Sequence, residues 1–268
     1  HFECETIDVR YDPRRRGAYA DEFHALRGRK GVTRRDAINL LKSPNYFGPM
    51  MVHVGDADGY LGGIAHHYPD IVKPCLQTIG PDPNAHRIVG MYMMTVNGEL
   101  MFIADATINI YPDPRTLAEI AVQTARVARR FGVKPKVAML SFSNFGTSSE
   151  LRTDRIEEAV AMARELDPTL VIDGPMQADT ALVPEIQKDF PFMSFEGAAN
   201  VLVCPNLASA NIAYKLLQRI AGAEMTGPIL EGLAKPAHVL QRGDSVRQVV
   251  HMAAITAVDA QRHARERL

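Results

Sequence analysis

Residues 114–143 read PRTLAEIAVQTARVARRFGVKPKVAMLSFS, and this stretch combines a helix pattern with a strand pattern. Apolar residues recur at helical spacing from Leu117 to Val127, and Gly132 ends the pattern. The apolar run at 137–142 then predicts a buried strand, followed at once by polar residues. A helix, a short turn and a buried strand in this order are typical of α/β proteins.

The same alternation continues on both sides of this stretch. Further helices are predicted over residues 33–41, 46–54, 69–79, 153–166, 180–186, 208–221 and 245–265. Further strands are predicted over residues 58–64, 88–95, 100–104, 170–174 and 200–204. Asn97-Gly98 predicts a hairpin between two of these strands. The pattern as a whole predicts an α/β fold with three layers, in which helices cover both faces of a mostly parallel sheet.

Two segments lack the apolar pattern of a strand or a long helix. Residues 11–35 are basic and polar, and a solvated face is favoured over contact with phosphate. Residues 222–236 are rich in glycine and proline and are predicted to be a bend. Thr33 is a predicted N-cap, and Asp244 or Ser245 is expected to cap the last helix.

Composition excludes several functional classes. The 268 residues have a net charge of −1, so no nucleic-acid-binding surface is indicated. No apolar run is long enough to span a bilayer. The three cysteines, Cys4, Cys75 and Cys204, are scattered without metal-ligand spacing, which favours a reduced, cytoplasmic protein with no metal site.

Loops at the carboxyl ends of strands are where ligands bind in open α/β sheets. The loop at 141–148 contains hydroxyls, an amide and a glycine, a composition suited to binding phosphate. The other candidate loops lie at 173–179, 205–211 and 241–245.

Three groups in or near these loops have competing interpretations. Asp173 and Asp179 are candidates for an acid/base pair, but turn or cap roles are favoured. His66 and His67 follow the predicted strand at 58–64, and because adjacent residues in extended backbone point to opposite faces, they would be poor co-ligands of a metal. The methionine-rich stretches are interpreted as core.

Several segments carry a family resemblance in the same order along the chain. They are GDADG (55–59), VAMLSFS (137–143), IDG (172–174), NVLVCPNL (200–207), NIAYK (211–215), GPILEGL (227–233) and AITAVDA (254–260). Taken together, these segments resemble the phosphate acetyltransferase (phosphotransacetylase) family from residue 8 to residue 261. The resemblance implies two lobes around a cleft, similar to isocitrate and isopropylmalate dehydrogenases. The first lobe would contain residues 1–148 and 240–268, and the second 149–239.

Two short segments resemble a subgroup of that family. LSFSNFG (140–146) and KPAHVLQ (235–241) are similar to the C-terminal domain of bacterial NADP-dependent hybrid malic enzymes. This resemblance implies a regulatory domain that binds acetyl-CoA as an effector and inhibits malate decarboxylation in an attached malic enzyme, which uses NADP and a divalent metal. A homodimer or larger assembly is expected. Because the chain opens at His1 without a Met, a fragment lacking the N-terminal part of the family fold is expected.

The site residues follow from the family pattern Ser-Arg-Gly-Cys-Ser-x-x-Asp. Arg242 and Gly243 match it, whereas Gln241, Asp244 and Gln248 replace its Ser, Cys and Asp. A carboxamide cannot accept a thiol proton, so impaired transferase activity is implied, with no confident catalytic residue. The residues expected to bind acetyl-CoA or phosphate are Ser141, Ser143, Asn144, Gly146, Thr147, Ser148, Lys73, Arg242 and Gly243; Lys73 stands in place of a family Arg.

Three functions are compatible with these features. The favoured hypothesis is the acetyl-CoA sensor of a malic enzyme. The second is an active phosphate acetyltransferase, in which Asp244 would be the only candidate base near Arg242. The third is a dimerising scaffold built on the apolar helices at 206–221 and 245–265.

Overall fold

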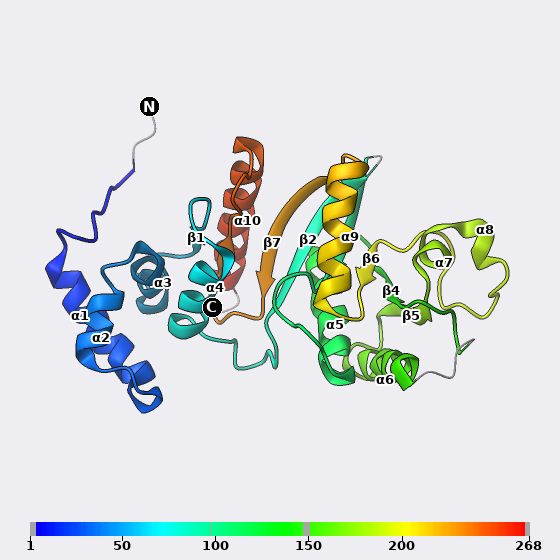
Figure 1. Ribbon diagram of the computed structural model, residues 1–268, viewed down its shortest axis with the longest axis horizontal. Helices are drawn as coiled ribbons and strands as arrows, with labels where there is room; N and C mark the ends of the chain where they lie inside the picture. Colours follow the sequence, from blue (N-terminus) through cyan, green and yellow to red (C-terminus); the bar gives the residue numbers. More distant parts are fainter. Residues whose placement is uncertain (1–3, 97, 147–150, 266–268) are drawn as a thin grey trace. The chain divides into compact units, whose positions relative to one another are not determined.

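The computed structural model describes residues 4–96, 98–146 and 151–265, and the chain divides into two compact units (Figure 1). Unit 1 contains His1–Asn84 and Leu233–Leu268, and unit 2 contains Ala85–Gly232. Each unit has its own sheet.

Unit 2 is built on a six-stranded sheet with the spatial order β5-β4-β6-β3-β2-β7. Its strands are β2 (Val89–Val96), β3 (Glu99–Ala104), β4 (Lys136–Leu140), β5 (Val171–Met176), β6 (Val201–Val203) and β7 (Glu224–Glu231). The pairs β5–β4, β4–β6 and β6–β3 are parallel, whereas β3–β2 and β2–β7 are antiparallel. The sheet is therefore mixed. Five of its six described strands run in one direction, as the prediction of a mostly parallel sheet requires, and β2 runs opposite to its neighbours β3 and β7 because a hairpin reverses the chain between β2 and β3.

The sheet also crosses the predicted lobe boundary at residue 148. β4 precedes that boundary in sequence, but it pairs with β5 and β6, which follow it. The units of the structure are thus divided at other points than the predicted lobes, 1–148 plus 240–268 and 149–239.

β7 occupies part of the segment that was predicted to be a bend. Its sequence includes Gly227-Pro228, and the register with β2 shifts between Met91 and Met93, opposite this dipeptide. Proline has no N–H to donate, so strands tolerate it at sheet edges and bulges. β7 lies at the sheet edge, where a proline is compatible with strand structure.

Helices cover both faces of the unit 2 sheet. They are α5 (Pro114–Arg130), α6 (Leu151–Leu166), α7 (Ala178–Leu182), α8 (Pro184–Gln187) and α9 (Leu207–Ile220). Tyr214 of α9 stacks on Tyr92 of β2 with ring centroids 4.2 Å apart. Phe131 at the end of α5 contacts Phe102 of β3. Tyr92 is paired with Ile103, the neighbour of Phe102, so the two contacts lie on opposite faces.

Unit 1 is mostly helical. Its elements are α1 (Pro13–Arg27), the short 3₁₀ helix Gly28–Lys30, α2 (Arg34–Leu40), α3 (Pro44–Val54), β1 (Tyr60–Gly62), α4 (Tyr68–Thr78), β8 (Ala237–Val239) and α10 (Val246–Arg265). β1 and β8 form a parallel pair. α1 was not predicted, because most of its residues are polar and the buried ones, Tyr19, Ala20 and Phe23, are too few to give an apolar helical pattern. The predicted N-cap Thr33 is confirmed and forms a capping box with Asp36.

The other predicted elements are confirmed with boundaries shifted by a few residues, except that the helix at 180–186 is two short helices, α7 and α8. Pro184 starts the second of them, since it cannot continue the hydrogen bonds of the first. In the described residues, no helix is long and apolar enough to cross a membrane.

Candidate active site

The turn at 241–244 leaves β8 in a fixed direction. The N–H of Leu240 donates to the Gly62 carbonyl oxygen at 2.8 Å, which extends the pairing of β1 and β8. Gly63 has a φ of +144° and lies directly against Leu240, because a Cβ at Gly63 would stand 2.0 Å from the Leu240 carbonyl oxygen. The position of the turn therefore depends on a glycine in β1's exit loop.

Arg242 lies exposed on this turn. Its Nη2 donates to the Ala65 carbonyl oxygen at 3.3 Å, which restrains one end of the guanidinium. Gly243 follows with a φ of +88°, a backbone conformation that side chains disfavour. A guanidinium has five N–H donors in a planar fork, so an exposed and restrained Arg242 is suited to binding an oxyanion.

Asp244 closes the turn. Its Oδ2 accepts from the Gln241 N–H at 2.7 Å, and its own N–H donates to the Gln241 carbonyl oxygen at 3.2 Å. The side chain is half-buried. Burial raises the pKa of the Asp244 carboxyl group, and the Gln241 N–H opposes this shift.

Gln248 has a structural contact at the start of α10. Its Oε1 accepts from the Ser245 N–H at 2.8 Å and from Ser245 Oγ at 2.9 Å. The Gln248 N–H donates back to Ser245 Oγ at 3.3 Å. Ser245 is thus the N-cap of α10, one of the two residues, Asp244 and Ser245, that were expected to cap this helix. The side chains of Ser245 and Gln248 form a capping box.

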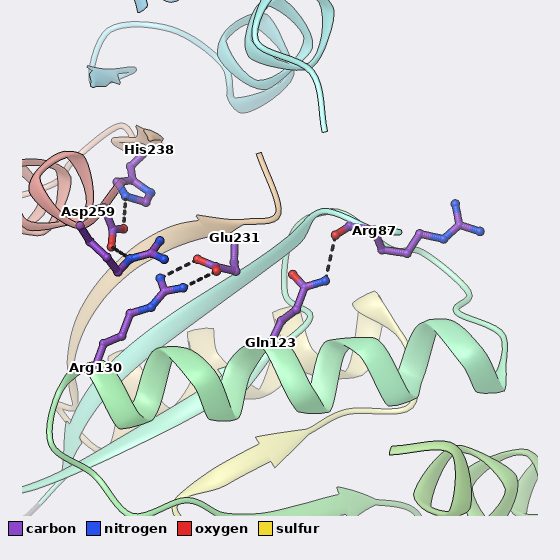
Figure 2. A network of polar contacts seen from close by, with 7 residues as sticks. Arg87, Gln123, Arg130, Glu231, His238 and Asp259 are labelled. Carbon is purple, nitrogen blue, oxygen red and sulfur yellow. Dashed lines mark hydrogen bonds and ion pairs between the residues drawn. The ribbon is translucent and has the colours of Figure 1, made fainter. Parts of the chain in front are cut away.

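A buried pair joins α10 to β8 behind this turn. Figure 2 shows His238 on β8 facing Asp259 on α10, with 3.0 Å between His238 Nε2 and Asp259 Oδ2. His238 is 1% exposed. Arg262 approaches the other oxygen of Asp259 at 3.7 Å. These contacts hold the helix against the strand that precedes Arg242.

Lys73, the other predicted anion-binding residue of unit 1, lies exposed on α4. The remaining predicted residues lie in unit 2, in the loop that follows β4. Thr147 and Ser148 lie outside the described residues. Ser141, Asn144 and Gly146 are at least partly exposed, whereas Ser143 is 7% exposed. The Ser143 hydroxyl has no hydrogen-bond partner among the described residues.

The loop after β4 is tied to β5 and to the residue that precedes α7. The N–H groups of Ser141 and Phe145 donate to the carbonyl oxygens of Met176 and Pro175. Asn144 Oδ1 accepts from the Gln177 N–H at 2.8 Å, and Asn144 Nδ2 donates to Gln177 Oε1. Two backbone N–H groups of the predicted phosphate loop are therefore already used within the protein.

Asp173 and Asp179 have the turn roles that were favoured for them. Asp173 accepts from the N–H groups of Gly174 and Ser194, and Asp179 accepts from the Thr180 N–H. His67 occupies the N-cap position of α4. Across the described ranges, no three His, Cys, Asp or Glu side chains are grouped as metal ligands would be.

Sequence reasoning missed the loop after β3. Asp105 is 2% exposed and accepts from the N–H groups of Thr107, Ile108 and Asn109 at 2.8, 3.0 and 3.0 Å. Asn109 Nδ2 also donates to Asp105 Oδ2 and to the Ile88 carbonyl oxygen. Burial raises the pKa of Asp105, and these donors oppose the shift. An aspartate directly after a strand, followed by Thr and Asn, was the available signal.

Comparisons with known proteins agree with each other. Residues 2–257 match the family described as phosphate acetyl/butaryl transferase. The chain is 41% identical to the phosphate acetyltransferase of Corynebacterium glutamicum over 90% of this chain and 74% of that protein. The Bacillus subtilis phosphate acetyltransferase is also 41% identical, over 93% and 78%.

Solved structures give the same result. A phosphotransacetylase from Streptococcus pyogenes superposes with a TM-score of 0.85 at 39% identity, covering 96% of this chain and 77% of that one. The EutD phosphotransacetylase from Staphylococcus aureus has a TM-score of 0.83 at 36% identity, covering 97% and 79%. The chain thus spans about three quarters of the length of these proteins.

These findings contradict the prediction of a regulatory domain from a malic enzyme, and with it the prediction of an NADP-dependent oxidoreductase. The relatives that match about nine tenths of the chain are named for the transferase itself. The malic enzyme resemblance depended on two segments of seven residues, 140–146 and 235–241, whereas the similarity to the Corynebacterium protein extends over 243 residues.

Proposed function

The chain belongs to the phosphate acetyl/butaryl transferase family, and on that premise we propose that it is a phosphate acetyltransferase. It would interconvert acetyl-CoA and phosphate with acetyl phosphate and CoA. The observation that carries this proposal is the 41% identity to two phosphate acetyltransferases over at least 90% of the chain.

The proposed reaction transfers an acetyl group between sulfur and oxygen. In the direction of acetyl-CoA formation, the CoA sulfur attacks the acetyl carbonyl carbon of acetyl phosphate and loses its proton to a base. The carbon–oxygen bond to phosphate then breaks, and phosphate leaves with the electron pair. The protein must therefore bind a phosphate dianion, accept a proton from sulfur and stabilise the negative charge on the former carbonyl oxygen.

Arg242 is the residue that we assign to the phosphate. Its guanidinium is exposed, and among the described residues a single hydrogen bond, to the Ala65 carbonyl oxygen, restrains it. Its planar fork matches two phosphate oxygens at once, which a lysine ammonium cannot do. Lys73 would add a second positive charge for the same anion or for CoA phosphates.

Kinetics of Arg242 variants test this proposal. We measure acetyl-CoA formation from acetyl phosphate and CoA by the wild-type chain and by the variants Arg242→Gln and Arg242→Lys. We expect kcat/KM for acetyl phosphate to fall about 10²–10³-fold in Arg242→Gln, the usual effect of removing one group that stabilises the developing negative charge. Arg242→Lys should recover only part of this loss.

An exposed arginine away from the turn gives the matched control. Arg35 lies on α2, and Arg35→Gln removes the same charge from the same unit. This variant should keep wild-type kinetics. A wild-type chain that forms no acetyl-CoA under these conditions would contradict the proposed function.

Other expectations stay predictions. They are binding of acetyl-CoA or phosphate by Ser141, Ser143, Asn144, Gly146 and Gly243, assembly as a homodimer or larger homo-oligomer, a cytoplasmic location and the likeness to the isocitrate dehydrogenase fold. Comparison of acetyl phosphate with butanoyl phosphate as substrates would test the acyl preference, since the family description includes both acyl groups.

A further inference from the structure

The proposed reaction requires a base that the family pattern does not supply here. A free thiol has a pKa of about 8.5, so only a few per cent of it is the reactive thiolate at neutral pH. A general base near the sulfur typically contributes about 10²–10⁴-fold to the rate. Gln248 stands at the expected position of the base, but a carboxamide has no basicity at this pH. Its Oε1 is moreover engaged by Ser245.

Most other carboxylates of unit 1 that have polar contacts are paired with side-chain donors. These pairs are Asp8 with Arg10, Asp21 with Arg34, Asp36 with Thr33, Asp56 with Tyr19 and Asp259 with His238. A carboxylate oxygen that already accepts a hydrogen bond from a side chain has less acceptor capacity left for a substrate proton.

Asp244 differs from these carboxylates in position and in contacts. It lies two residues after Arg242 on the same turn, and backbone hydrogen bonds with Gln241 in both directions fix its orientation. Among the described residues, only Oδ2 of Asp244 accepts a hydrogen bond, and the donor is a backbone N–H rather than a cation. The second oxygen, Oδ1, is left to accept a proton.

The environment of Asp244 favours this chemistry. Half-burial disfavours the ionised form and raises its pKa, so the carboxylate is a stronger base than an exposed aspartate. This inference rests on the proposed function, in which the charge of Arg242 binds the substrate phosphate. Arg242 as the phosphate-binding residue and Asp244 as the base would then lie on the same turn, whose direction is set by the close approach of Gly63 to Leu240.

We propose that Asp244 is the general base that removes the thiol proton of CoA. In acetyl-CoA formation, Asp244 Oδ1 takes the proton while the sulfur forms its bond to the acetyl carbon and phosphate departs. In the reverse direction, the protonated Asp244 returns the proton to the leaving sulfur.

The test compares the two positions in the same chain. Asp244→Asn keeps an oxygen for the Gln241 N–H but removes the base. We expect kcat to fall about 10²–10⁴-fold with little change in KM for acetyl phosphate. Gln248→Ala, the matched control, loses only the cap contact and should keep kcat within a few-fold of wild type.

The pH dependence of the Asp244→Asn variant gives a second readout that a structural role would not change. Without a base, the variant depends on thiolate already present in solution. Its rate should then rise about tenfold per pH unit below the thiol pKa of about 8.5, more steeply than in wild type. The double variant Asp244→Asn/Gln248→Asp restores a carboxylate at the family position and should regain part of the lost kcat.

The outcomes separate the inference from the proposed function. If wild type is active and folded Asp244→Asn keeps wild-type kcat, the base assignment is wrong and the transferase function stands. If the wild-type chain is inactive, both the base assignment and the proposed transferase function are wrong. Should Asp244→Asn fail to fold, Asp244→Ser, which also offers an oxygen to the Gln241 N–H, replaces it, and wild-type kcat in that variant likewise overturns the assignment.

Discussion

The loop after β3 and the turn after β8 each contain one aspartate, and the protein holds the two carboxylates in opposite ways. Asp105 is 2% exposed and accepts from three backbone N–H groups and one side-chain amide. Asp244 is half-buried and accepts from the Gln241 N–H. Burial is the main cause of a raised pKa at both residues.

Under the roles proposed for them, the number of donors, rather than burial alone, distinguishes the structural carboxylate Asp105 from the reactive carboxylate Asp244. All the acceptor capacity of Asp105 is directed at its own loop, so its removal should unfold that loop. Asp244 keeps an oxygen for a substrate, so its removal should affect turnover and leave stability almost unchanged. Three predictions test this distinction.

The largest effect on stability is expected at Asp105. In Asp105→Ala, three partly buried N–H groups lose their acceptor, each at a cost of about 1–3 kcal/mol when water cannot replace it. We expect the free energy of unfolding to fall by about 3 kcal/mol or more, measured by urea denaturation. Asp105→Asn keeps one acceptor oxygen and should lose less. If Asp105→Ala were as stable as Asp244→Asn, the distinction between the two carboxylates would be wrong.

Like Asp105, Glu231 is a carboxylate with both oxygens used within the protein, but its donor is a cationic side chain instead of backbone N–H groups. Arg130 on α5 donates to both oxygens of Glu231 on β7, at 2.8 and 2.5 Å, and both side chains are less than 20% exposed (Figure 2). Arg130→Met leaves a largely buried carboxylate without its partner, at an expected cost of about 2 kcal/mol in urea denaturation. The neighbouring pair Arg129–Asp167 is the control.

That control pair is more open to solvent, with Arg129 39% exposed. Arg129→Met should therefore cost less than about 1 kcal/mol. Equal losses in the two methionine variants would mean that burial of the pair contributes nothing.

The smallest of the three main losses, apart from the Arg129 control, is expected at Asp113, an exposed carboxylate at the start of α5. Its oxygen accepts from the Thr116 N–H at 2.7 Å, and the hydrogen bond from Thr116 lowers the pKa of Asp113. A lowered pKa stabilises the fold above the unfolded value of about 3.9, and this contribution is lost as pH falls through the folded pKa. Asp113→Ala should cost about 1 kcal/mol at pH 7.

The pH series distinguishes Asp113 from Asp105. In urea denaturation, the deficit of Asp113→Ala should shrink as the pH is lowered toward about 3. The sign at Asp105 is opposite: because its pKa is raised, protonation at lower pH favours the folded state. A deficit of Asp113→Ala that stays constant over the series would show that the cap does not depend on its charge.

The helices and most strands were predictable because their burial repeats along the chain. α5 shows this best: Leu117, Ile120, Ala121 and Thr124 recur at helical spacing, and all are fully buried. β7 and α1 were missed for opposite reasons. Gly227-Pro228 looked like a bend, although a sheet edge tolerates it, and α1 buries only three residues, which its charged residues hide.

The candidate site was predictable in part. Arg242 and Gly243 were identified from a short motif, and the structure places them on an exposed turn. Ser143, however, is buried, and Asn144 is bonded to Gln177. Such contacts join segments more than thirty residues apart in sequence, so no local pattern indicates which polar groups of a loop are already used.

The sequence by itself determined the alternation of helices and strands, the helix caps and the presence of Arg242 and Asp244 on one short turn, because each depends on neighbours along the chain. Tertiary structure alone decided the mixed sheet order, the burial of His238 and Asp105, and the number of donors around each carboxylate. These properties depend on segments distant in sequence, and hydrogen-bond partners and loss of water are set only when such segments pack together.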